Sequence, residues 1–196
     1  MTVFQDADVA ILMADYVATD AAGKLNAIGV GFNMMLPQPG GVTPPFGLAV
    51  TCNVPVRHVG TQYTLGVELH DATRGRIVQV PSDPMGGTQA VRAQQLVAVD
   101  TPVIPPGFAR PEGLWVQHIM SLMFPAGLPL EAGTYEWRVQ IDSQYMTRRR
   151  RTFHVMGPDP GVIVGGPANA PNIPGVVTYG VITEPEADTP GEPEQS

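Results

Sequence analysis

Apolar and polar side chains alternate along much of the chain before residue 157. The clearest alternation covers residues 62–71, where polar residues separate four apolar ones: Tyr63, Leu65, Val67 and Leu69. Successive side chains of a β-strand point to opposite faces of a sheet, so a period of two predicts one buried and one solvated face. The same pattern recurs after a turn at residues 129–133, in Tyr135, Trp137, Val139 and Ile141.

Further strands are predicted between turns that contain proline and glycine. They cover residues 9–17, 24–36, 46–54, 76–80 and 145–156. Two more segments, residues 89–99 and 114–124, fit a helix or a strand, because their apolar spacing does not decide between the two. Prolines follow the first of these segments and its surroundings are β, which favours a strand there.

The predicted strand at residues 24–36 has glycine inside its alternation. Gly29 and Gly31 alternate with three apolar residues, so one face of this strand is nearly bare. Glycine inside a strand often marks a bulge or the close approach of another backbone. Together with the apolar segment before it, this strand predicts an N-terminal hairpin.

Eight or nine strands joined by Pro/Gly turns predict an all-β fold, an antiparallel β-sandwich. Residues 1–156 form the predicted sandwich domain and are numerous enough to bury a sizeable core. We find no convincing helix pattern and no internal repeat. The sequence therefore predicts one β-domain followed by a chemically different segment.

That segment, residues 157–196, is an extended arm rich in proline and glycine. It contains six acidic residues and no Lys or Arg, and it supplies most of the formal net charge of −7. The preceding domain is close to neutral, so it has no overall field that favours nucleic acid or a membrane surface.

Two β-prone islands interrupt the prolines of the arm. The first is Val162-Ile163-Val164, and the second runs from Val176 and Val177 through Tyr179 to Val181 and Ile182. One interpretation is a flexible linker with incidental valines. The favoured interpretation is an arm that docks on a neighbouring subunit, because an extended segment can add a strand to an exposed sheet edge.

Cysteine, leader and membrane signals exclude several classes of protein. Cys52 is the single cysteine, so an intrachain disulfide is impossible, and its apolar neighbours predict a buried side chain. The N-terminal sequence has no basic region followed by a long apolar run, so no signal peptide is expected. Prolines break the uncharged stretch 25–56, which excludes a spanning helix there. We expect synthesis in a bacterial cytoplasm.

Two stretches carry a family likeness. Residues 14–16 (Ala-Asp-Tyr) end an apolar strand, and residues 23–29 (Gly-Lys-Leu-Asn-Ala-Ile-Gly) start the next one. This opening resembles a bacterial and bacteriophage β-sandwich domain family of unknown function. Phe124-Pro125 followed by residues 130–139 is similar to the Gly-x-Tyr-x-aromatic strand of immunoglobulin-like and C2-like sandwiches. The resemblance covers about residues 8–156 and implies a fold without a reaction.

Catalytic and metal-binding patterns are weak throughout the sequence. The histidines stand singly at positions 58, 70, 118 and 154, with no second His or Cys at the short spacing of metal sites. No serine lies in a Gly-x-Ser-x-Gly elbow, and Met34 replaces the third glycine of a dinucleotide loop. We therefore expect no catalytic residue, no metal and no cofactor.

A run of four arginines, Arg148, Arg149, Arg150 and Arg151, lies inside a predicted strand. Side chains alternate faces along a strand, and burying unpaired guanidiniums costs several kcal/mol each, so the run should lie beyond the covered part of the sheet. It fits a solvated, edge-protecting charge run. It also fits a salt-bridging contact with an acidic neighbour or the acidic arm, and nucleic-acid binding is the least favoured.

The leading functional hypothesis is a non-enzymatic structural protein of a bacteriophage virion, a head accessory or decoration protein. Its partners would be the major capsid protein or neighbouring copies, with the arginine run and the two islands as contact residues. A minor tail or connector protein fits almost as well. The rival classes are a cytosolic bacterial binding module and an enzyme whose site combines Asp15, Glu68 and His70.

Overall fold

The computed structural model describes residues 2–38, 40–82, 86–109 and 113–157, and Met1–Gly157 form one compact unit. From residue 158 onward the predicted arm lies outside the described residues, together with its two islands. The described part of the chain consists mostly of strands in several sheets, which confirms the all-β class.

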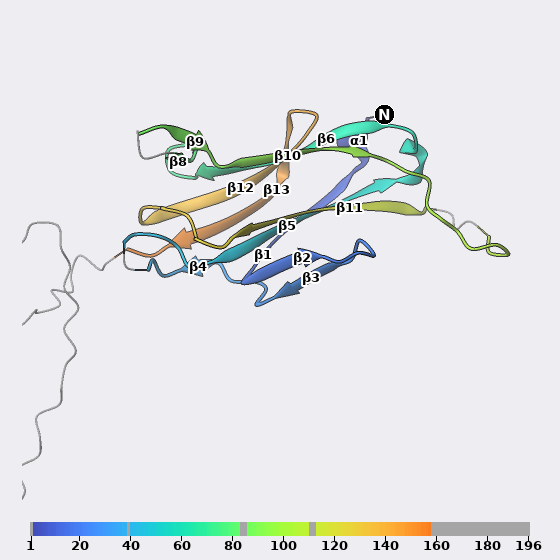
Figure 1. Ribbon diagram of the computed structural model, residues 1–196. Helices are drawn as coiled ribbons and strands as arrows, with labels where there is room; N and C mark the ends of the chain where they lie inside the picture. The colour runs from blue at the N-terminus through green and yellow to red at the C-terminus, as the bar shows by residue number, and fades with distance from the viewer. Residues whose placement is uncertain (1, 39, 83–85, 110–112, 158–196) are drawn as a thin grey trace, which may run out of the picture. The chain divides into compact units, whose positions relative to one another are not determined.

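Thirteen strands and two short helices are present in the described residues (Figure 1). The helices are α1 (Val3–Asp6) and the 3-10 helix η1 (Val56–His58). The long strands are β1 (Asp8–Ala14), β5 (Phe46–Pro55), β6 (Gln62–Asp71), β10 (Arg92–Ala98), β11 (Trp115–Phe124), β12 (Gly133–Ile141) and β13 (Gln144–Val155). The short strands are β2 (Tyr16–Thr19), β3 (Leu25–Ile28), β4 (Met34–Met35), β7 (Arg76–Ile77), β8 (Gln79–Pro81) and β9 (Thr88–Ala90).

The long strands are divided between two sheets. Strands β1, β5 and β11 form a three-stranded antiparallel sheet with β5 in the middle. The six-stranded sheet has the order β10-β6-β12-β13-β4, and β7 pairs with β6 beside this path. Figure 1 shows the two sheets as separate layers, with the β2–β3 hairpin beyond the three-stranded sheet.

One apolar core joins the inner faces of the two sheets. Phe46 of β5 stacks on Phe124 of β11 with ring centroids 4.8 Å apart, and it contacts Phe153 of β13 at 6.5 Å. Phe124 also lies 5.7 Å from the ring of Trp137 on β12. Burying a phenylalanine fully contributes about 1.5–3 kcal/mol, so these inward-facing rings are a large part of the cohesion between the sheets.

The β2–β3 hairpin covers the outer face of the three-stranded sheet through a small second cluster of Ala14, Val17 and Ala49. Gly47 of β5 makes this approach possible. A Cβ at Gly47 would lie 2.6 Å from Val17 Cγ2 and 2.8 Å from Met123 Sδ. A larger side chain at this position would therefore push the hairpin off the sheet.

The N-terminal strands differ from the expected hairpin. Residues 9–17 do not form one strand, because β1 pairs with β5 while β2 pairs with β3. The predicted strand 24–36 is divided into β3, which ends at Ile28, and the two-residue β4, and between them Gly29 and Gly31 have φ values of +70° and +101°. The close approach expected at Gly29 is real, but the Asp15 side chain makes it instead of a backbone.

The two ambiguous segments are strands. Residues 92–98 form β10 and residues 115–124 form β11, each at the outer edge of its sheet. The thirteen strands exceed the eight or nine predicted because six of them have two to four residues. Periodicity needs a longer window than that to indicate a strand.

Candidate functional sites

The outer face of the six-stranded sheet, which points away from the core, carries a network of charged side chains. Alternation along β6 places Glu68 and His70 on this face, and the register places Arg138 and Glu136 of β12 directly opposite them. A solvated face was predicted here, but this was wrong for two positions, because Glu68 and His70 are 5% and 4% exposed.

Tyr145 of β13 accounts for part of this burial. Its hydroxyl donates a hydrogen bond to Glu68 Oε2 at 2.6 Å, and His70 Nε2 lies 3.2 Å from the same oxygen. The His70 and Tyr145 rings meet edge to face with centroids 5.8 Å apart. Burial, followed by the hydrogen bond to Glu68, raises the pKa of Tyr145, so its hydroxyl remains a donor at neutral pH.

A second cluster on this face places two guanidiniums around one carboxylate. Arg138 Nε donates to Glu136 Oε1 at 2.6 Å, and Arg150 Nη1 lies 3.4 Å from Glu136 Oε2. Glu136 is buried, whereas Arg138 and Arg150 line a hollow of about 200 Å³ with Tyr145. Guanidinium donors arranged in this way suit a carboxylate or a phosphate.

The four-arginine run lies within β13, at a register shift between β12 and β13. Arg149 pairs with Asp8 of β1, Arg150 pairs with Glu136, and Arg151 donates to the Phe32 carbonyl at 3.0 Å. Both ion pairs of the arginine run therefore use acidic residues of the compact unit Met1–Gly157, which we call the body. Arg148 to Arg150 are exposed as expected, but Arg151 is half-buried, because the β3–β4 connection packs against it and accepts its hydrogen bond.

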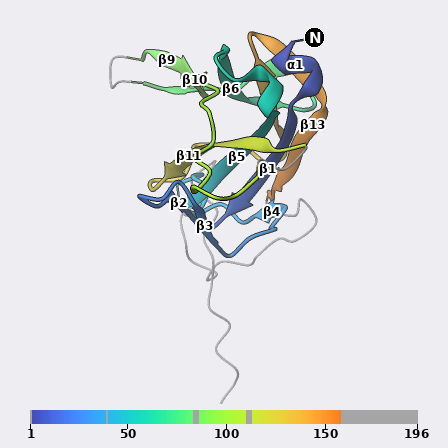
Figure 2. The same ribbon diagram turned by 90° about the vertical axis from the view of Figure 1, so that its right-hand side faces the viewer.

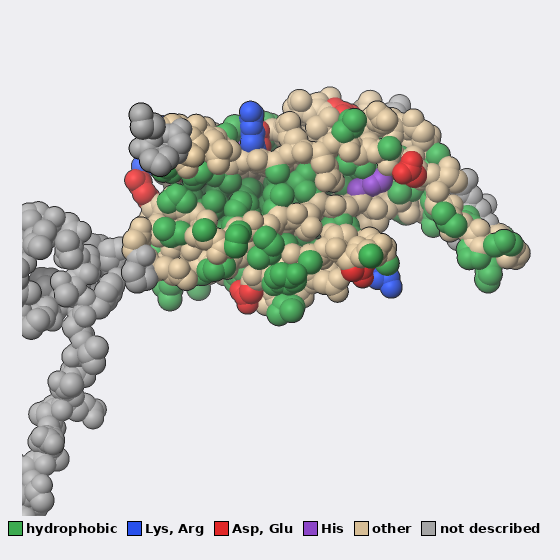
Figure 3. All heavy atoms as spheres, viewed as in Figure 1, with side chains coloured by type: hydrophobic (Ala, Val, Ile, Leu, Met, Phe, Trp, Pro, Cys, Tyr) green, Lys and Arg blue, Asp and Glu red, His purple; other side chains and the backbone are tan. Residues whose placement is uncertain are grey.

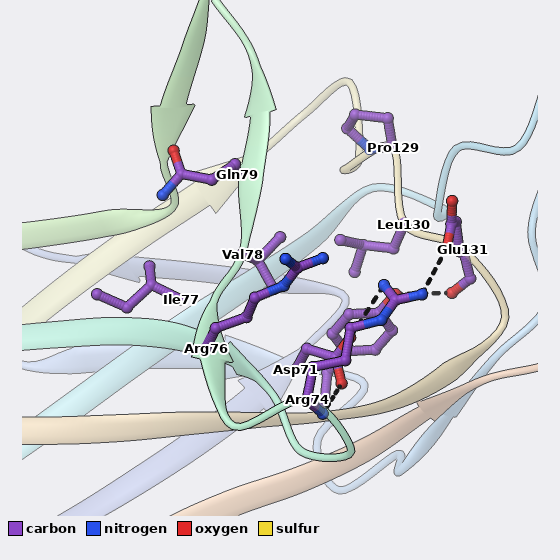
Figure 4. Close-up of a pocket in the computed structure, with 10 residues that line it drawn as sticks. Asp71, Arg74, Arg76, Ile77, Val78, Gln79, Pro129, Leu130 and Glu131 are labelled. Atoms are coloured by element: carbon purple, nitrogen blue, oxygen red, sulfur yellow. Dashed lines mark hydrogen bonds and ion pairs between the residues drawn. The ribbon is translucent and has the colours of Figure 1, made fainter.

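A mixed-charge pocket of about 390 Å³ lies beside the β6–β7 turn and the loop before β12 (Figure 4). Arg74 bridges two carboxylates, with Asp71 Oδ2 at 3.3 Å and Glu131 Oε2 at 3.6 Å. The Arg76 side chain extends into the same pocket beside Val78 (Figure 4). Charged groups therefore converge over an apolar floor.

The three residues of the enzyme hypothesis are not brought together. Glu68 and His70 are neighbours on β6, but Asp15 lies at the β1–β2 junction beside Gly29. Each histidine has a separate environment: His58 pairs with Asp6 at 2.7 Å and His154 lies 3.1 Å from the Thr134 hydroxyl. Among the described residues, no group of three or more His, Cys, Asp or Glu could hold a metal ion.

Polar groups also lie inside the core, between the two sheets. Cys52 is fully buried, as predicted, and burial raises the pKa of its thiol to about 11. The rings of Tyr63 on β6 and His118 on β11 meet 5.7 Å apart, edge to face. The Tyr63 hydroxyl interacts with the Cys52 thiol, whereas His118 Nε2 has no hydrogen-bond partner within the described residues. Burial lowers the pKa of His118, so the imidazole is neutral at pH 7.

We expect the stability cost of His118 to appear as the pH falls. Its folded-state pKa lies below the ordinary value, so the unfolded chain binds a proton that the folded chain refuses, and stability falls below about pH 6.5. The variant His118→Leu removes this pH-dependent contribution to the free energy of unfolding. Urea unfolding at pH 8, 7, 6 and 5 measures the free energy of unfolding of both chains. The difference between the two values should be constant above pH 7 and should shift in favour of His118→Leu below it. A constant difference from pH 8 to pH 5 would contradict a lowered pKa of His118 in the folded chain.

The two lateral sides of the stacked sheets are different. On one side β13 lies beside β1, and Arg149 and Asp8 connect the two sheets (Figure 2). On the other side a groove of about 330 Å³, with both polar and apolar lining, separates the edge strands β10 and β11. Leu122, Met123 and Trp137 are among its lining residues. Figure 3 shows the apolar side chains gathered between the two layers on this side.

Sequence reasoning missed Tyr145, Glu136, Arg138 and the lining of this groove. Glu136 and Arg138 alternate with apolar residues in β12, so the outward pair was visible in the pattern. Tyr145 was not recognisable, because its contact with Glu68 spans 77 residues and depends on the irregular β12–β13 pairing. The groove exists because the edge strands β10 and β11 lie apart in the folded protein. The order of apolar and polar residues along the sequence does not reveal this separation.

Comparison with known proteins gives no relative from which a role could be transferred. The chain matches no family model, and no curated protein is significantly similar to it. The helices of the described residues are too short to cross a membrane.

Proposed function

We propose that this protein is a non-enzymatic structural protein of a bacteriophage virion, a head accessory or decoration protein. The body is a β-sandwich, antiparallel except for the β4–β13 pair, that docks on a protein lattice, and the C-terminal arm reaches a neighbouring subunit. The phage setting rests on the family resemblance of residues 8–156. The contact role rests on the surface chemistry of the body.

The observation that carries the proposal is an exposed apolar surface around β4, which we name the β4 surface. It lines a hollow of about 580 Å³, and its members include Val30, Phe32, Met34, Leu36, Pro44 and Pro45. Leu36 is 73% exposed and Met34 is 59% exposed. Contiguous exposed apolar surface of this kind marks protein–protein contacts, because leaving it in water is unfavourable.

The test compares two leucines of similar exposure. Leu36→Asp places a charge on the β4 surface, whereas Leu96→Asp, at 70% exposure on β10, places it elsewhere. We expect Leu36→Asp to reduce incorporation into purified phage particles at least about tenfold, because an unpaired charge would be buried at the contact. Leu96→Asp should be incorporated like the unmodified chain. Absence of the unmodified chain from particles, by mass spectrometry, would overturn the proposal.

A second candidate function is ligand binding, and the pocket in Figure 4 favours it. Arg74, Asp71 and Glu131 hold one another in place, and Arg76 has no partner within the described part of the chain. An anionic small molecule with an apolar portion would fit the Arg76 guanidinium and the apolar floor. Isothermal titration with candidate acids, using Arg76→Gln as the control, distinguishes this role from lattice docking.

A further inference from the structure

The segment that follows β10 carries apolar side chains that no other described residue covers. Val103 is 97% exposed and Phe108 is 73% exposed. Residues 101–109, which we name the proline loop, read Thr-Pro-Val-Ile-Pro-Pro-Gly-Phe-Ala and contain no charged residue. The loop extends beyond the ends of the strands at the right of Figure 1, and Figure 3 shows hydrophobic side chains along it.

A tight turn at the end of the proline loop positions the backbone of Phe108. The Phe108 N–H donates to the Pro105 carbonyl at 3.3 Å, and Gly107 has a φ of +87°. Proline at the second position and glycine with positive φ at the third, as in this turn, are typical of type II. Because proline restricts the backbone before any contact forms, binding through this turn loses little conformational entropy. The loop therefore presents its exposed phenylalanine in a preorganised form.

The β4 surface has the chemistry to receive this side chain. Its hollow of about 580 Å³ is lined mainly by apolar residues, and Asp15 is the one charged residue among the described lining residues. Met34 and Leu36 are exposed there. A phenylalanine buries about 150–250 Å² when it is covered. Phe108 would be covered by apolar neighbours in this hollow, and the uncharged loop would bring no charge to be desolvated.

The proline loop and the β4 surface lie at opposite ends of β5. Pro44 and Pro45 line the hollow and immediately precede β5. The loop returns to the body at the other end of this strand, where the Val56 N–H donates to the Leu114 carbonyl at 3.1 Å. A strand of ten residues spans about 33 Å, and Figure 1 shows the loop directed away from β4. The loop of one chain therefore does not reach its own hollow and is available to another copy.

We propose that the proline loop of one copy inserts Phe108 into the hollow of the β4 surface of a second copy. The inference rests on the proposed contact function and names the partner of the β4 surface. Both halves of the contact occur on one chain, so the contact is head-to-tail and each added copy leaves a free loop and a free hollow. The contact repeats from copy to copy, and it closes as a ring where the rotation between copies allows it.

Two full-length variants separate the halves of this contact. Phe108→Asp places a charge on the loop and keeps the hollow, whereas Leu36→Asp places a charge in the hollow and keeps the loop. In sedimentation experiments each variant alone should associate at least about tenfold more weakly than the unmodified chain, because a charge would be buried without a partner. Leu96→Asp, of similar exposure on β10, should associate like the unmodified chain.

An equimolar mixture of the two variants gives the decisive measurement. The intact loop of Leu36→Asp still matches the intact hollow of Phe108→Asp, so the mixture should form dimers and no larger species. A symmetric contact between two β4 surfaces would instead leave Phe108→Asp unaffected, and mixing would restore nothing for Leu36→Asp. Recovery on mixing also shows that both variants are folded, as expected for two side chains that are each 73% exposed.

The outcomes separate this inference from the proposed function. If the unmodified chain stays monomeric, or if Phe108→Asp associates as the unmodified chain does, the assignment of the loop is overturned. Loss of Leu36→Asp from phage particles in either case would mean that the β4 surface contacts another virion protein, and the proposed function stands. If the unmodified chain associates through the loop but is absent from particles, the proposed function fails while the contact between copies stands.

Discussion

Replacing Gly127 with alanine should lower the free energy of unfolding by about 3 kcal/mol. Gly127 has a φ of +67°, a conformation that costs an L-residue about 1–2 kcal/mol. A Cβ there would also lie 1.9 Å from the Thr43 carbonyl oxygen. That backbone cannot yield without weakening two bonds between Thr43 and Leu128, each of 2.9 Å and worth about 1 kcal/mol.

Gly75 provides the matched control for this substitution. Its φ is +66°, nearly the same as that of Gly127, but a Cβ there meets nothing within 4 Å. Gly75→Ala therefore measures the backbone strain alone, about 1–2 kcal/mol. In thermal unfolding, where 1 kcal/mol corresponds to about 2–4 °C for a chain of this size, Gly127→Ala should melt several degrees below Gly75→Ala. Equal melting temperatures would show that the Thr43 backbone moves aside freely.

Gly127 and Gly75 also illustrate what the sequence reveals. Glycine supplies positive φ at no steric cost, so either position suits a turn. The sequence does not distinguish them, since the Thr43 carbonyl comes from a loop 84 residues away from Gly127. A local pattern is therefore compatible with a turn at each position, but it does not contain the crowding that makes one glycine irreplaceable.

The strands show the same contrast between what a local sequence pattern predicts and what non-local contacts decide. Residues 62–71 and 133–141 were predicted because their apolar side chains recur at every second position and face one core. Asp15 interrupts the predicted strand 9–17, because the chain there leaves β5 and turns to pair with β3. This break depends on the non-local pairing of β1 with β5, so alternation alone did not reveal it.

The candidate sites were harder to predict than the fold. Glu68 and His70 were noted as outward polar residues, and the structure makes them neighbours. Part of their burial comes from Tyr145, which follows a tight turn at Asp142 and Ser143, both with positive φ. The arginine run was recognisable as a charge cluster, but its partners Asp8 and Glu136 belong to distant strands.

Replacing Trp137 with alanine is expected to cost about 3–5 kcal/mol of stability, a large fraction of the total for a domain. Trp137 is 1% exposed and its ring packs 5.7 Å from Phe124, so truncation removes a contact between the two sheets. Trp115→Ala, at 48% exposure, should change stability by less than about 1 kcal/mol. Urea unfolding followed by far-UV circular dichroism measures both variants without relying on tryptophan emission.

Trp137→Phe distinguishes the contribution of the aromatic ring to stability from that of the indole N–H group. The indole Nε1 is buried without a partner among the described residues, so phenylalanine removes an unsatisfied donor while it keeps an aromatic ring beside Phe124. We expect the loss to stay below about 1.5 kcal/mol, because the desolvation of that donor offsets part of the lost volume. A cost for Trp137→Phe as large as that for Trp137→Ala would mean that the N–H group already has a partner in the free protein.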